Sequence, residues 1–285
     1  MDCWKVITIG QLLKKTPSRL KSDTARLDTQ VLLARATRKS RSWVLAHPEV
    51  NLTQAQEKKL EAMVARVAAG EPLPYVLGEW EFNGLTFKLS PDVLIPRPET
   101  ELLVETALRW LKLNPGRRWM VDVGTGCGCI AASLATKLTD LEVIATDISA
   151  AAIEVARKNA RRLGVAERVN FSCCDLLPAT HDQYDLIVAN LPYIPTETLR
   201  GLPIYQREPS LALDGGANGL DLFRRLLSQA PDRLRHGGLM LLEIEATQGP
   251  AVLSLAYDAF AEAEIRLHKD LGGRDRLLEV QTFDQ

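Results

Sequence analysis

Hydrophobic and polar positions before residue 79 follow a helical period. On one face of a helix predicted over residues 53–69, apolar side chains recur at i, i+3, i+4 and i+7: Leu60, Met63, Val64 and Val67. Thr53 and Gln56 have the spacing of a capping box at its start. Gly70 and then Pro72 provide the stop.

A second helix is predicted from about Asp23 to Thr37, with Leu27, Val31 and Ala34 forming its apolar stripe. Residues 1–70 carry no strand pattern. We therefore expect a small helical-bundle domain over residues 1–78.

The pattern changes at residue 79. Asn83-Gly84 lies between two β-prone runs, which predicts a β-hairpin and a linker over residues 79–90. Pro98 then suits the first turn of a helix. The apolar positions expected to face inward on that helix are Leu103, Ala107 and Trp110 or Leu111.

From residue 119 strand-like and helix-like runs alternate. The strand-like runs are Trp119–Val123, Glu142–Thr146, Val169–Ser172, Asp185–Ala189 and Leu239–Ile244, with two further runs near Ile265–His268 and Leu277–Val280 as edge strands. Residues 150–163, closed by Gly164, are typical of the helices between them. This alternation predicts a doubly wound α/β domain over residues 91–285, with a parallel sheet covered on both faces.

Charge is unevenly distributed over the 285 residues, although the formal net charge is −1. Residues 1–78 hold 13 Lys and Arg against 7 Asp and Glu, a balance of +6. The remainder holds 22 against 29, a balance of −7. The basic half either faces an anionic partner or has a solvated basic surface.

The cysteines do not form a disulfide or zinc pattern. They are Cys3, Cys127, Cys129, Cys173 and Cys174. Their odd number and the scattered histidines 47, 181, 236 and 268 predict no metal site, and we expect buried thiols in a reducing compartment. The first residues lack a signal-peptide pattern, and no apolar run of about 18 residues occurs, so we expect no membrane association and a cytoplasmic protein.

A glycine-rich turn follows the first strand of the α/β domain, formed by Gly124, Thr125, Gly126, Cys127 and Gly128. A dinucleotide site would place its third glycine where Cys129 stands, which disfavours a NAD-linked oxidoreductase. Asp147 ends the next strand, where a carboxylate accepts hydrogen bonds from ribose hydroxyls. We therefore predict a nucleoside with a short tail, as in S-adenosylmethionine. The alternative is a turn that only packs helix on sheet.

Asp175 and Leu176 follow the third strand, in the position that borders the adenine in such sheets. Leu176 could provide an apolar contact to the ring. An aspartate that only satisfies a loop is nearly as good an interpretation of Asp175.

Asn190, Leu191, Pro192 and Tyr193 follow the fourth strand. Ligands of open α/β sheets bind beyond these strand ends, so this tetrad and the glycine-rich turn should face one cleft. The Asn190 side-chain oxygen and the Leu191 carbonyl can each accept one N–H of a planar NH2 group, which orients its lone pair toward a methyl donor. Pro192 stiffens the loop, and the Tyr193 ring can pack along the substrate. A strand end with turn residues is the alternative.

These motifs together resemble those of the PrmC (HemK) family, the glutamine N5-methyltransferases of peptide chain release factors. The segments that carry the resemblance are residues 70–78, 81–82, 94–101, 121–128, 190–193, 208–209, 212–216, 269–271 and 273–276. It extends over nearly the whole chain.

The resemblance implies a seven-stranded, Rossmann-like methyltransferase domain that converts S-adenosylmethionine to S-adenosylhomocysteine without a metal. The implied acceptor is the glutamine amide of the Gly-Gly-Gln motif in bacterial class I release factors, whose methylation modulates translation termination. It assigns the cofactor to residues 124–128, Asp147, Asp175, Leu176 and Asn190, and the substrate amide to residues 190–193. It also implies that residues 1–78 help to hold the release factor. We expect a monomer without stable nucleic-acid binding.

Two positions depart from the family pattern. Leu191 stands where the family usually has a first proline, although leucine retains the carbonyl. Leu176 stands where some members have an aromatic residue near the adenine.

Two rival functions remain at this point. An adenine-N6 methyltransferase of DNA or RNA would use the same tetrad but needs a basic groove, which the −7 balance of the catalytic half disfavours. A non-catalytic binding protein with the same fold is disfavoured by the presence of Asp147, Asn190 and Tyr193.

Overall fold

The computed structural model describes residues 7–180 and 182–284, so that Cys3 and His181 lie outside the described residues. The chain forms two compact units that divide after Glu79. Each unit is described by itself below. None of the helices within the described ranges is long and apolar enough to cross a membrane.

The N-terminal unit is helical, as its pattern predicts. Its elements are α1 (Ile9–Lys15), η1 (Thr16–Arg19), α2 (Ala25–Thr37), α3 (Arg41–Ala46), α4 (Gln54–Ala68) and α5 (Leu73–Leu77). The capping box of α4 is present: the Gln56 amide N–H donates to Thr53 Oγ1 at 3.3 Å, and the Thr53 N–H donates to Gln56 Oε1 at 2.9 Å. Leu60, Met63 and Val64 are buried.

The predicted stripe of α2 is wrong. Leu27 is 42% exposed. Val31 and Ala34 are only partly buried. The buried face instead contains Asp28, Thr29, Leu32, Leu33 and Ala36. A polar residue can face the core here because the Thr29 hydroxyl donates to the Ala25 carbonyl oxygen at 2.8 Å.

The second unit opens with the predicted hairpin, β1 (Glu79–Phe82) and β2 (Leu85–Lys88). Asn83 and Gly84 both have positive φ, 51° and 75°, the conformation of a type I′ turn. Pro98 begins a short 3₁₀ turn, η2 (Pro98–Thr100), which leads into α6 (Glu101–Leu113). Leu103, Ala107 and Leu111 are buried on α6, whereas Trp110 is only partly buried.

All seven predicted strands form one sheet. They are β3 (Trp119–Val123), β4 (Glu142–Asp147), β5 (Val169–Cys173), β6 (Tyr184–Ala189), β7 (Leu234–Glu243), β8 (Ala263–Lys269) and β9 (Asp275–Thr282). Their order is β5-β4-β3-β6-β7-β9-β8. β9 pairs antiparallel with both β7 and β8, and the other pairs are parallel, so the sheet is mixed and not parallel throughout as predicted. The strand order therefore reverses between β3 and β6, which is where ligands bind in such sheets.

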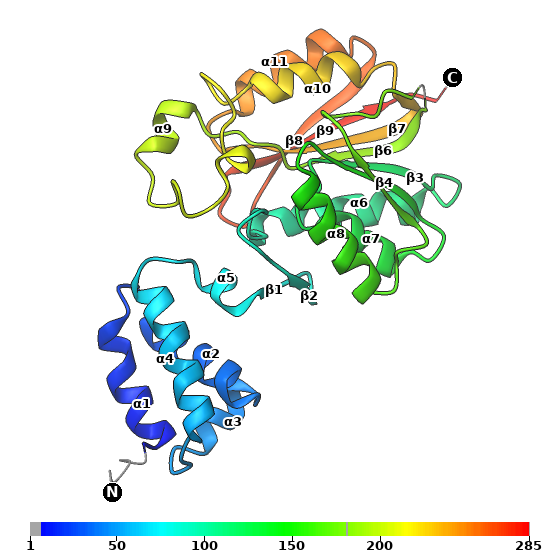
Figure 1. Ribbon diagram of the computed structural model, residues 1–285. Helices are drawn as coiled ribbons and strands as arrows, with labels where there is room; N and C mark the ends of the chain where they lie inside the picture. The colour runs from blue at the N-terminus through cyan, green and yellow to red at the C-terminus, as the bar shows by residue number, and fades with distance from the viewer. Residues whose placement is uncertain (1–6, 181, 285) are drawn as a thin grey trace, which may run out of the picture. The chain divides into compact units, whose positions relative to one another are not determined.

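Helices cover both faces of the sheet, which confirms the doubly wound α/β fold. The helices α6, α7 (Cys129–Lys137) and α8 (Ala150–Arg162) lie on one face (Figure 1). The helices α10 (Asp221–Gln229) and α11 (Gly249–Ala259) lie on the other. The long connection between β6 and α10 contains α9 (Thr196–Arg200) and η3 (Ser210–Ala212).

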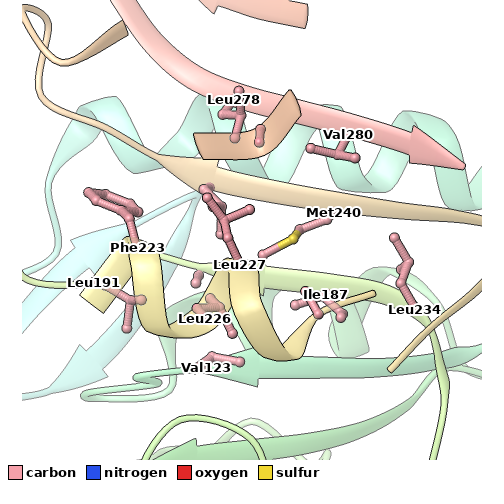
Figure 2. Packing of buried hydrophobic residues seen from close by; sticks show 14 of the residues in the cluster. Val123, Ile187, Leu191, Phe223, Leu226, Leu227, Leu234, Met240, Leu278 and Val280 are labelled. Carbon is pink, nitrogen blue, oxygen red and sulfur yellow. The ribbon is translucent and has the colours of Figure 1, made fainter. Parts of the chain in front are cut away.

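The core beneath α10 joins the strands at the switch point. Figure 2 shows Phe223, Leu226 and Leu227 of α10 against side chains of the sheet, among them Val123 and Met240. All of these side chains are at most 2% exposed.

The cysteines are free thiols in the described residues. The expectation that they are buried is correct for Cys127 and wrong for Cys173, which is exposed at the end of the edge strand β5. Cys129 and Cys174 are partly buried.

We predict that Thr53→Ala lowers the free energy of unfolding by about 1 kcal/mol, because α4 loses an N-cap that satisfies the Gln56 N–H. Urea denaturation followed by circular dichroism measures this. Thr53→Ser keeps the hydroxyl and should behave as the native protein. Equal midpoints for the alanine variant and the native protein would contradict the capping role.

Candidate active site

The glycine-rich turn and the tetrad open onto one cavity of about 790 Å³. Ten of the predicted site residues line it: Gly124, Thr125, Gly126, Cys127, Asp147, Asp175, Leu176, Asn190, Leu191 and Pro192. Gly128 and Tyr193 are not among the described lining residues. Sequence segments far apart along the chain therefore meet at the carboxyl ends of β3, β4 and β6.

The three glycines of the turn have positive φ, 74° at Gly124, 55° at Gly126 and 80° at Gly128. A Cβ built on Gly126 would meet no described heavy atom within 4 Å, so its backbone borders open space. A Cβ on Gly128 would lie 3.1 Å from the Ala156 Cβ. Gly128 is thus required for close packing of α7 against α8 rather than for contact with the cavity.

A fully buried carboxylate organises the same turn from inside the fold. Asp122 Oδ2 accepts the Thr125 hydroxyl at 2.7 Å and the Ala131 N–H at 3.2 Å. Burial raises the pKa of Asp122 to about 6, although both hydrogen bonds lower it. In the sequence this aspartate is part of the segment of residues 121–128. The signal in the sequence was an acid inside an otherwise apolar strand.

Asp147 holds the turn from the neighbouring strand. Its Oδ2 accepts the Gly126 N–H and its Oδ1 accepts the Ser149 N–H, both at 2.9 Å. Burial raises the pKa of Asp147, against these hydrogen bonds. Each carboxylate oxygen has a further lone pair, so the side chain can still accept hydrogen bonds from ribose hydroxyls.

Asp175 and Leu176 occupy the turn after β5. Asp175 forms an ion pair with Arg225 of α10, and both side chains are about half exposed. Leu176 is buried with a positive φ of 61°, and its carbonyl oxygen accepts the Thr146 hydroxyl at 2.8 Å. This bond fixes an apolar side chain at the wall of the cavity.

The tetrad lies directly beside the glycine-rich turn. A Cβ built on Gly124 would lie 3.0 Å from Leu191 Cδ2 and 4.0 Å from the Asn190 carbonyl oxygen. Only glycine allows the two strand ends to approach so closely. The Asn190 side chain donates through Nδ2 to Thr100 Oγ1 at 3.0 Å.

Leu191 anchors the tetrad in the core. Its side chain is 4% exposed and belongs to the cluster beneath α10 (Figure 2). The position is thus fixed by burial of an apolar side chain, where a proline would restrict the backbone itself.

A glycine-containing loop supports the other end of the tetrad. The Ile194 N–H donates to the Leu213 carbonyl at 3.0 Å, and the Gly215 N–H donates to the Ile194 carbonyl at 2.9 Å. A Cβ on Gly215 would lie 2.7 Å from the Tyr193 Cα, which explains why this position of the motif is glycine. Gln248 Nε2 also donates to the Tyr193 carbonyl oxygen at 2.9 Å.

Tyr193 directs its hydroxyl toward a buried acid, with 3.4 Å between the hydroxyl oxygen and Glu243 Oε1. Burial raises the pKa of Tyr193. Thr100 belongs to the motif of residues 94–101, whereas no motif contains Glu243. The signal for Glu243 was a carboxylate directly after the apolar run Leu239–Leu242.

An ion pair joins two other motifs near the cavity. Arg97 Nη2 lies 2.5 Å from Glu208 Oε1, and Glu208 Oε2 accepts the Ile95 N–H at 3.2 Å. Glu208 is 6% exposed. Arg97 lines the cavity, so this pair fixes the segment that carries it.

The lining fits S-adenosylmethionine in size and chemistry. The cavity combines a carboxylate at the end of β4, a glycine-rich turn with open space beside Gly126, and an apolar wall at Leu176. No group of three or more metal-ligating side chains occurs in residues 7–180 and 182–284. The fold and this site define an S-adenosylmethionine-dependent methyltransferase.

Comparison with known proteins identifies the family. Residues 11–78 match the PrmC N-terminal domain, and residues 99–200 match the Methyltransferase small domain. The release factor glutamine methyltransferase of Moorella thermoacetica is 45% identical over 95% of this chain and 97% of its own length. That of Bordetella pertussis is 42% identical over 88% and 93%. The chain belongs to the release factor glutamine methyltransferase family.

A solved structure supports the fold alone. The 16S rRNA N2 G1207 methyltransferase of T. thermophilus, in complex with AdoMet and guanosine, superimposes with a TM-score of 0.51 at 19% identity. The match covers 72% of this chain and 49% of that chain.

We predict that Asp147→Ala raises the dissociation constant of S-adenosylmethionine by roughly 10- to 100-fold, because hydrogen bonds to a charged group are lost and the glycine-rich turn loosens. Isothermal titration calorimetry measures this. Asp140→Ala is the control, because Asp140 is an exposed acid paired with Arg118 just before the same strand. Unchanged affinity in Asp147→Ala would refute a role at the ribose.

Proposed function

We propose that this protein transfers the methyl group of S-adenosylmethionine to N5 of the glutamine in the Gly-Gly-Gln motif of bacterial class I release factors. Two observations support the proposal. One is the similarity to release factor glutamine methyltransferases, which covers 95% of this chain in the relative from Moorella thermoacetica. The other is the close approach of Gly124 and Leu191, which line the same cavity. The second observation is the one that a methyl transfer requires, since donor and acceptor must be in line.

The tetrad orients the acceptor nitrogen. Asn190 Oδ1 and the Leu191 carbonyl oxygen each accept one N–H of the glutamine amide, so that the nitrogen lone pair points toward the glycine-rich turn. Asn190 Nδ2 is already engaged by Thr100, which leaves Oδ1 for the substrate. When bound, S-adenosylmethionine supplies an electrophilic sulfonium methyl group at this place.

The two oxygens also stabilise the positive charge that develops on the acceptor nitrogen. No strong base is needed before transfer, because the amide proton can leave afterwards. We assign S-adenosylhomocysteine as the product and no metal to the reaction.

We assign recognition of the release factor to the N-terminal domain, residues 1–78. Its balance of +6 supports contact with an anionic surface. A hollow of about 530 Å³ in this unit is lined by Arg35, Arg38, Lys39 and Lys59, together with Glu79, which forms an ion pair with Arg35 at 2.9 Å. We propose that the enzyme acts as a monomer in the cytoplasm, where release factors are found.

Mass spectrometry of a release factor incubated with the enzyme and S-adenosylmethionine tests the function. One added methyl group on the glutamine of the Gly-Gly-Gln peptide is expected. DNA and RNA oligonucleotides are the comparison substrates. Methylated adenine together with an unmodified release factor would instead establish the nucleic-acid function.

Asn190→Ala should retain most of its affinity for S-adenosylmethionine but lose turnover roughly a hundredfold, because one of the two acceptors that orient the amide is gone. Single-turnover kinetics with release factor measures this, and calorimetry checks the cofactor. Turnover within about threefold of the native rate, a difference of ~0.65 kcal/mol, would contradict the acceptor role.

A further inference from the structure

Two buried polar residues lie behind the tetrad. Thr100 is 2% exposed at the end of η2, and Glu243 is 1% exposed at the end of β7. Glu243 Oε2 has no hydrogen-bond partner among the described residues. A buried carboxylate with an unsatisfied oxygen is costly, which calls for a functional reason.

Hydrogen bonds connect these residues to the tetrad at two points. Asn190 Nδ2 donates to Thr100 Oγ1 at 3.0 Å, and the Thr100 side chain lies close enough to Glu243 to lower the pKa of that carboxyl. The Tyr193 hydroxyl approaches Glu243 Oε1 at 3.4 Å. Glu243 is thus the common end of two connections that start at the first and last residues of the tetrad.

The direction of these hydrogen bonds follows from the chemistry of each group. An ionised carboxylate only accepts, so toward Glu243 the Thr100 hydroxyl can act only as a donor. The Thr100 oxygen must then accept, and the group facing it must be the Asn190 NH2. If the Asn190 amide rotated by half a turn, its Oδ1 would face the Thr100 Oγ1, and two acceptors would meet. This arrangement therefore keeps Oδ1 on the cavity side.

We propose that Thr100 and Glu243 are positioning residues, which hold the Asn190 side-chain amide with its oxygen toward the acceptor nitrogen. This proposal rests on the proposed function, since it concerns the orientation of the same acceptor. Thr100 lines the cavity and acts through Asn190, whereas Glu243 is not among the lining residues and acts through Thr100 and Tyr193.

The ionisation of Glu243 is coupled to this orientation. Burial, with a smaller contribution from neighbouring Glu99, raises the pKa of Glu243 to about 7. Thr100 and Arg276 of β9 act in the opposite direction, and Tyr193 faces the same carboxyl. Protonated Glu243 can donate to Thr100, whose hydrogen can then turn toward Asn190 and favour the inverted amide.

Thr100→Val tests the connection because it removes the hydroxyl and preserves the shape. We expect kcat on release factor to fall about tenfold, the effect of roughly one hydrogen bond, with KM and cofactor affinity within about twofold. Thr100→Ser keeps the hydroxyl and should restore most of kcat. Thr106→Val, a buried threonine on the following helix, is the matched control and should leave kcat unchanged.

Glu243→Gln separates positioning from stability. Because the pKa of Glu243 is raised in the folded protein, protonated Glu243 contributes to stability. This contribution is fully present below about pH 4.5 and is lost as the pH rises through about 7. The change in melting temperature caused by Glu243→Gln should therefore be more favourable at pH 8 than at pH 5. At pH 8, where the native carboxylate is ionised, the kcat of Glu243→Gln should be lower than that of the native enzyme.

The pH profile of kcat gives a further readout. The native rate should rise through about pH 7, and this step should be absent in Glu243→Gln. If native enzyme methylates release factor while Thr100→Val keeps the native kcat, or Thr100→Ser loses as much as Thr100→Val, the positioning role is overturned. An inactive native enzyme would instead overturn the proposed function.

Discussion

The close approach of the first and fourth parallel strands in chain order, β3 and β6, is the constraint on which the site depends. These strands are neighbours in the sheet, yet their following segments run to opposite faces, so a cavity opens between their carboxyl ends. The glycine at position 124 permits the Leu191 side chain to lie against it, and the tetrad is thereby placed beside the glycine-rich turn. A larger residue there would separate the two loops whose proximity the transfer requires. The parallel register of β3 with β6 keeps this distance fixed.

Acids that are buried or partly buried shape the loops around this cavity. Asp122 and Asp147 each accept a backbone N–H of the turn or the helix that follows it, and Glu243 lies behind the tetrad. Burial raises the pKa of all three. Such groups reduce stability near neutral pH, because their charged forms have lost water. Their placement around a single cavity serves the geometry of the loops at the expense of the stability of the fold.

Local patterns in the sequence predicted most of the fold. The hairpin depends on Asn83-Gly84, and each strand depends on its own apolar run, so neighbouring residues were sufficient. The stripe of α2 failed because apolar residues occur around much of that helix, and only packing in the bundle decides which of them are buried. Thr100 and Asn190 are 90 residues apart, and Tyr193 and Glu243 are 50 apart. No local pattern in the sequence predicts contacts between residues so far apart. The position of Glu243 after an apolar run does indicate one of the partners.

Leucine at position 191 shows how two requirements on one residue can be separated. The proposed chemistry uses the backbone carbonyl, which every residue has, whereas the rigidity of the loop depends on the side chain. Proline restricts the backbone directly. Leu191 instead buries its side chain among Val123, Phe223 and their neighbours, so the carbonyl is held by packing. The loop is also held at Tyr193 by Gln248 and by the backbone bonds of residues 213–215. With both ends of the tetrad fixed in this way, the side-chain amide of Asn190 is the remaining degree of freedom, and the buried pair behind it is in the right place to remove it.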